Sequence, residues 1–107
     1  EKLNALQGFN DYEYTLVSSD LALTDQEYVG VDTTSGTVTL TLPKLSSDTK
    51  RFVIADVKGT AGTNPIVINV HADDAGSLVG DTSFSLVNNY ASLTLSSVDN
   101  PPRWVVT

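Results

Sequence analysis

The sequence predicts an all-β domain, a single antiparallel β-sandwich or small barrel of about eight short strands. Apolar residues recur at every second position through most of the chain, as in strands that bury one face. Residues that favour turns interrupt this alternation about every ten residues, which is the spacing of small all-β domains. Beyond residue 10, no segment keeps the apolar stripe of an amphipathic helix.

The clearest element is the stretch from Val31 to Pro43, which contains a turn, a strand and a stop signal. Residues 33–36 favour a turn, and Gly36 can adopt a positive φ. Residues 37–42 alternate threonine with an aliphatic residue, so the aliphatic side chains should share the buried face. Pro43 has no N–H to donate, so pairing should end there.

The N-terminal residues differ from the rest of the chain. We expect residues 1–10 to form a linker, or the end of a preceding helix or shaft in a longer chain, and residues 11–107 to form the β module. Leu3, Leu6 and Phe9 recur at every third residue, which fits one or two helical turns. An isolated helix this short would be marginally stable.

The first strand is expected where Tyr12, Tyr14 and Leu16 alternate with polar residues, over about seven residues. Residues 21–27 fit a strand, a turn or a short capped helix, and residues 28–32 fit a short strand ahead of the central turn. Asn88 and Asn89 fit a tight turn because asparagine tolerates a positive φ. Later strands are expected at residues 51–57, 66–70, 78–79, 84–87, 91–96 and 103–106.

The predicted core gathers the apolar side chains that share one face of each strand. Four consecutive apolar residues, 52–55, indicate a strand with apolar side chains on both faces. The opposite faces are rich in threonine and serine. The predicted core residues are Leu16, Val31, Val38, Leu40, Leu42, Phe52, Ile54, Ile66, Ile68, Phe84, Leu86, Leu93, Leu95 and Trp104.

Composition argues against several classes of partner. The chain has a formal net charge of −7, and its six Lys and Arg residues are scattered. Nucleic acids and anionic membrane surfaces both select clustered basic residues, so neither partner is expected. The chain has no cysteine, and no apolar run approaches the roughly 20 residues of a membrane-spanning helix. No cofactor is expected.

The residues that could carry chemistry do not form a recognisable catalytic or metal-binding motif. His71 is the single histidine, and no Gly-x-Ser-x-Gly motif is present. His71, Asp73 and Asp74 are interpreted as a solvated turn rather than a metal site, because calcium needs more oxygen ligands at regular spacing. Asp11 and Glu13 share a strand face, but a glycosidase also needs a cleft. The chain is therefore expected not to be an enzyme.

Several motifs make the chain resemble a small β module found in tail fibres, tailspikes and head fibres of tailed bacteriophages. The resemblance runs from about residue 12 to the C-terminus and rests on turn and strand signals. The motifs are Tyr14-x-Leu16, Tyr28-Val29-Gly30-Val31-Asp32-Thr33, Gly36-x-Val38-Thr39-Leu40-x-Leu42-Pro43, Ile54-x-Asp56, Gly59-x-Ala61-x-Thr63-Asn64-Pro65-Ile66-x-Ile68, Asn100 and Trp104-x-Val106.

The resemblance implies a structural or adhesive role on a virion, association into a trimer and no catalytic residues. Val53 offers an apolar side chain to a neighbouring subunit, on the strand face opposite Phe52 and Ile54. Leu3, Leu6 and Phe9 could pack near a threefold axis. These four residues are the expected trimer interface.

Two alternatives stay open at this point. The first is a module that binds a cell-surface glycan, with Tyr12 and Tyr14 stacking on sugar rings and the loop residues Thr60 and Asn64 contributing polar contacts. The second is a decoration protein or head fibre on the capsid surface. No metal site is expected under any of these interpretations.

Overall fold

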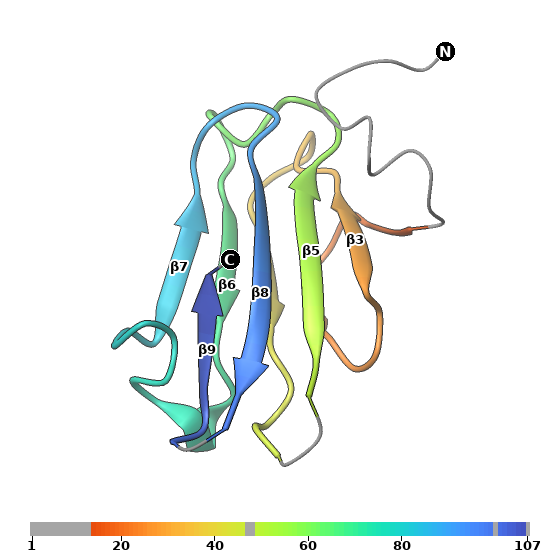
Figure 1. The fold of residues 1–107 in the computed structure, drawn as a ribbon. Helices are drawn as coiled ribbons and strands as arrows, with labels where there is room; N and C mark the ends of the chain where they lie inside the picture. Colours follow the sequence, from red (N-terminus) through yellow and green to blue (C-terminus); the bar gives the residue numbers. More distant parts are fainter. Residues whose placement is uncertain (1–13, 47–48, 100, 107) are drawn as a thin grey trace.

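The computed structural model describes residues 14–46, 49–99 and 101–106 and shows two packed β-sheets (Figure 1). Sheet A has the strand order β1 (Thr15–Val17), β3 (Tyr28–Val31), β5 (Arg51–Asp56), β8 (Ser92–Val98) and β9 (Arg103–Val106). Sheet B has the order β2 (Leu21–Ala22), β4 (Val38–Thr41), β6 (Ile66–Asn69) and β7 (Ser83–Leu86). One short 3₁₀ helix, η1 (Ala72–Asp74), follows β6. The predicted all-β class is confirmed.

The expectation that all strands run antiparallel is wrong for the first six. These strands alternate between the sheets, so the chain winds around the core as three coils. Strand β3 therefore pairs in parallel with β1 and β5, and β4 pairs in parallel with β2 and β6. The last three strands pair antiparallel, β7 with β6, and β8 with β5 and β9.

Strand β4 lies where the alternation predicted it. Val38 and Leu40 face the core, while Thr39 and Thr41 face outward and are partly exposed. The turn before the strand closes with Gly36 N–H donating to the carbonyl oxygen of Thr33, at 3.2 Å between nitrogen and oxygen. Regular pairing ends one residue before Pro43, where Leu42 N–H donates to the carbonyl oxygen of Asn69.

Twelve of the fourteen predicted core residues are buried, and Leu16 and Phe84 are not. Leu16 is paired with Gly30, between the inward-facing Val29 and Val31, so Leu16 faces outward and is 57% exposed. Phe84 faces the core side of edge strand β7, where one flank is open, and is 40% exposed. The buried apolar residues also include seven that the alternation did not predict, namely Val17, Leu23, Val29, Ala55, Ala61, Val70 and Leu78.

Two connections differ from their predicted form. Leu78 and Val79 belong to a tight turn over residues 78–81 rather than to a strand, and Leu78 makes isolated bridges to Asp81 and Trp104. Ala91 N–H donates to the carbonyl oxygen of Asn88, so the predicted turn exists, but Tyr90 adopts the positive φ of 62°. This turn also carries the chain from sheet B to sheet A, so it does not join a hairpin.

Candidate interaction surfaces

Asp56, at the end of β5, organises the loops that meet at one end of the molecule (Figure 1). Its side chain is fully buried. One carboxylate oxygen accepts the backbone N–H groups of Lys58 and Gly59, at 3.2 and 3.0 Å. The other oxygen accepts those of Ala61 and Tyr90, both at 2.9 Å. The carboxylate thus fixes the β5–β6 connection and joins it to the β7–β8 connection.

These contacts also set the protonation behaviour of Asp56. Burial by itself would raise the pKa of the carboxyl group, because it disfavours the charged form. The N–H donors of Ala61, Tyr90 and Lys58 stabilise that charged form more strongly, so the pKa lies below its ordinary value. Asp56 is therefore a charged structural anchor and not a candidate proton donor at neutral pH.

Thr60 and Asn64, predicted as ligand-binding residues, lie in the same group of loops and contact Thr33. The hydroxyl oxygens of Thr60 and Thr33 are 2.7 Å apart, and the Asn64 amide donates to the Thr33 carbonyl oxygen at 2.8 Å. Thr33 itself is buried. Both side chains hold the β3–β4 and β5–β6 connections together, and their binding of a glycan remains a prediction.

Two tyrosine rings lie against glycine backbones at this end of sheet A. A Cβ atom added to Gly30 would come within 2.7 Å of the Tyr14 ring, and one added to Gly59 within 2.5 Å of the Tyr90 ring. Gly59 also has a φ of 76°, which other residues rarely adopt. Tyr14 remains 41% exposed, so part of its ring is open to solvent. Tyr12, Leu3, Leu6 and Phe9 lie outside the described residues.

The outward surface of sheet A, here called the A face, carries more apolar side chains than the outward surface of sheet B. Strand register places Val53 near its centre, between Tyr28 of β3 and Thr94 of β8. Val53 is partly exposed, as predicted for an outward side chain opposite Phe52 and Ile54. The other exposed or partly exposed residues of the A face include Tyr14, Leu16, Ser92, Ser96 and Val105, whereas Gly30 and Ala55 point to the same side but are buried.

The outward surface of sheet B, here called the B face, is mainly polar. Its central strand β6 presents Val67 and Asn69, and its other outward side chains are mostly hydroxyls. The B face consists of Ala22, Thr39, Thr41, Val67, Asn69, Ser83 and Ser85. The two sheets therefore bury similar cores but present different surfaces to the solvent.

Carboxylates are concentrated away from both faces. Among the described residues, Asp56 is the only Asp or Glu within a strand, and it is buried. On the A face, Arg51 pairs with Glu27 at 3.3 Å, with both side chains about half exposed. Arg103 donates to the carbonyl oxygen of Pro101 at 2.8 Å. The A face thus lacks the excess of negative charge that the chain has as a whole.

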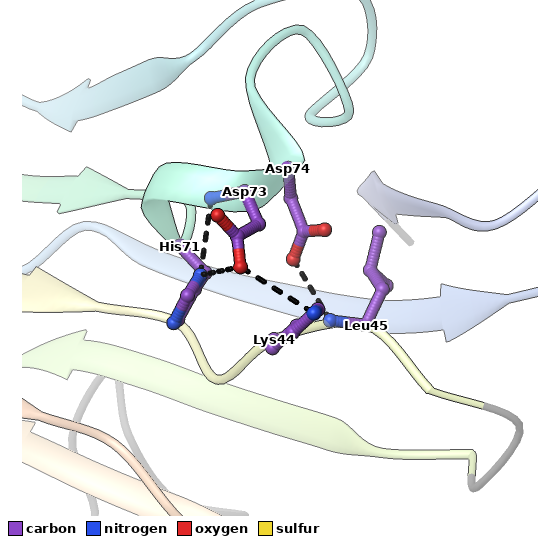
Figure 2. Close-up of polar contacts among 5 residues, drawn as sticks. All are labelled: Lys44, Leu45, His71, Asp73 and Asp74. Atoms are coloured by element: carbon purple, nitrogen blue, oxygen red, sulfur yellow. Dashed lines mark hydrogen bonds and ion pairs between the residues drawn. The ribbon is translucent and has the colours of Figure 1, made fainter.

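The residues around His71 make a structural turn, as Figure 2 shows. Asp74 accepts the backbone N–H of Leu45 at 2.8 Å, which attaches η1 to the segment after β4. His71 Nδ1 accepts the N–H of Asp73 at 3.1 Å, and Asp73 pairs with Lys44 at 3.4 Å. No group of His, Asp and Glu among the described residues is arranged to hold a metal ion.

Two open grooves lie at the ends of the sheets. A groove of about 490 Å³ runs between the β1–β2 and β3–β4 connections, and four of its six lining residues are Ser or Thr. Its lining residues are Ser18, Ser19, Asp20, Ser35, Gly36 and Thr37. A second groove of about 300 Å³ is lined by both charged and polar residues, among them Asp25, Glu27, Lys50 and Arg51.

No family model and no curated protein matches this sequence. Within the part of the chain that the structure describes, no helix is long and apolar enough to cross a membrane. Sequence reasoning missed Asp56 as the centre of the loop contacts. Its position between an apolar strand and the Lys58-Gly59 pair was a local signal, since Asp commonly accepts N–H groups two and three residues ahead.

Proposed function

We propose that this chain is a non-catalytic structural module of a bacteriophage virion, part of a tail fibre, spike or head fibre, that associates with copies of itself as a trimer. The observation that carries the proposal is the contrast between the two sheet faces. The A face has tyrosine, leucine and valine at its surface, and the B face has hydroxyl and amide groups. Exposed apolar patches of this kind mark interaction surfaces.

Charge supports a second copy as the occupant of the A face. Two chains with a net charge of −7 repel each other unless they meet where carboxylates are sparse. The strands of the A face contribute no exposed carboxylate among the described residues, and Glu27 at its margin is paired with Arg51. Depletion of charge with enrichment of aromatic residues is also typical of interface cores. The trimeric state and the virion come from the resemblance.

The experiment compares Val53→Asp with Val67→Asp. Both valines are partly exposed, face outward and lie near the centre of a sheet, Val53 on the A face and Val67 on the B face. Val53→Asp should dissociate the trimer while the monomer stays folded, because the charge enters every interface that symmetry repeats. Val67→Asp should leave the trimer intact.

Light scattering measures the molar mass of both variants in solution, and circular dichroism verifies that they are folded. A wild-type mass of one chain at high micromolar concentration contradicts self-association. Equal behaviour of the two variants contradicts the choice of the A face.

Glycan binding is the second candidate, favoured by the hydroxyl-lined groove beside Asp20 and the half-exposed ring of Tyr14. Neutral sugars are recognised by such hydroxyl and carboxylate groups together with an aromatic platform. A glycan array distinguishes the two functions: a saturable signal that Asp20→Ala or Tyr14→Ala abolishes in a still-trimeric protein assigns receptor binding to this end of the molecule.

A further inference from the structure

The turn between η1 and β7 has an unusual residue at its tip. Leu78 and Asp81 exchange two backbone hydrogen bonds, at 2.9 and 2.7 Å, and enclose Val79 and Gly80. Both enclosed residues have positive φ, 49° for Val79 and 88° for Gly80. Two-residue turns of this form favour Asn, Asp or Gly at both positions, and a β-branched residue there is strained.

The rest of the turn is held firmly, so Val79 cannot relax. Leu78 is buried in the core. Trp104 N–H donates to the Ser77 carbonyl oxygen at 2.8 Å, and Val79 N–H donates to the Trp104 carbonyl oxygen at 3.3 Å. Gly76 N–H donates to the Thr82 hydroxyl at 3.2 Å. Strain that the surroundings enforce in this way is a pointer to function.

The strained side chain is also the most exposed large hydrophobic residue of the described chain. Val79 is 65% exposed, so burial of its side chain in the core does not offset the strain of its backbone. The parallel bridge between Leu78 and Trp104 places the turn along the free edge of β9, so the turn extends sheet A. Val79 therefore lies at the margin of the A face, next to the backbone that leads into Val105.

We propose that Val79 is an interface residue that inserts, as an apolar knob, into the A face of a second copy of this chain. The inference rests on the proposed self-association and names one of its contacts. Edge meeting face is a heterologous contact, the type that closes a ring of subunits when the rotation permits. Charge is consistent with a second copy as the partner. The exposed Asp81 beside Val79 of one copy is opposite in sign to Arg103 on the A face of the other, where the guanidinium donates to a carbonyl oxygen.

The test is Val79→Asn, which should change stability and association in opposite directions. Asparagine tolerates a positive φ, so the dissociated chain should unfold at higher denaturant concentration than the wild type. Loss of a buried valine side chain should weaken the association by about tenfold or more. Both quantities are measured on the whole chain, unfolding at a concentration where it is monomeric and association by sedimentation.

Val87→Asn is the matched control, because Val87 is 53% exposed, does not have a positive φ and lies in the β7–β8 connection. This control should change neither quantity appreciably. A Val79→Asn protein that associates as tightly as the wild type overturns the inference, whether or not its monomer is stabilised. If Val53→Asp still dissociates the assembly in that case, the proposed function survives without this contact. A monomeric wild type refutes both.

Discussion

Leu40 and Thr39 are adjacent residues that should respond very differently to truncation. Leu40 is fully buried between the sheets, whereas Thr39 faces outward on the B face. Leu40→Ala should therefore lower the free energy of unfolding by about 2–5 kcal/mol, because it leaves a cavity. Thr39→Ala should cost much less. Chemical denaturation measures both, and equal small losses would contradict the assignment of the two faces of β4.

Asp56 should contribute most of its stabilisation as a carboxylate. Asp56→Asn replaces one acceptor oxygen by an NH₂ group that faces two backbone N–H donors, and should cost on the order of 3 kcal/mol. The control is Asp32→Asn, because the solvent-exposed Asp32 carboxylate accepts one backbone N–H, that of Thr34, and the asparagine oxygen can keep it. Little change is expected there.

The same contacts predict the direction of the pH dependence. In the unfolded chain Asp56 takes up a proton near its ordinary pKa, about 4, and in the folded chain only at lower pH. The stabilisation is thus complete above that ordinary pKa and is lost as the pH falls towards the folded pKa. Chemical denaturation measured from neutral to acid pH should show that the free energy of unfolding falls less in Asp56→Asn than in the wild type. If the free energy of unfolding falls equally with pH in both proteins, Asp56 does not cause the pH dependence.

At the scale of elements, local alternation of apolar residues predicted where strands lie in the sequence better than it predicted whether they pair parallel or antiparallel. Strand β4 lies where its alternation placed it, because it has a clear apolar face and a turn signal on each side. The direction of pairing was not predictable in this way. Gly, Ser and Asp favour a turn whether the chain returns beside its own strand or crosses to the opposite sheet. The short connection 18–20 consists of turn-forming residues and carries the chain from sheet A to sheet B.

The sequence analysis assigned the wrong face of strand β1 to the core. Tyr14 and Leu16 alternate with polar residues, which suggests that they are buried, but Val17 is the residue that enters the core. A strand with apolar side chains on both faces has no unique inward face by periodicity, so the neighbouring strand decides. Gly30 of β3 leaves room for the Tyr14 ring on the A face. The apolar surplus of β1 is thus part of the A face.

At the scale of the whole molecule, the candidate surfaces were only partly visible in the sequence. Val53 was predicted as an outward residue of a two-sided apolar strand, and the register places it centrally on the A face. The proposed role of Val79 was not visible in the sequence, because its conformation depends on backbone contacts with Trp104, 25 residues further along the chain. The hydrogen bond from Tyr90 N–H to Asp56 was not predictable either, because these two residues are also far apart in the chain. Long-range pairing determines these features.

The charge distribution of the whole molecule predicts how salt should affect assembly. The chain has 13 acidic and 6 basic residues, so copies repel at low ionic strength. Raising NaCl from about 0.05 M to about 0.5 M shortens the screening length and weakens this repulsion, while apolar contact across the A face is not weakened. The proposed trimer should therefore dissociate less at higher salt, which sedimentation at matched protein concentration would measure. Val53→Asp should stay monomeric throughout, and a wild-type trimer that dissociates as salt rises would show that ion pairs, rather than the A face, hold it together.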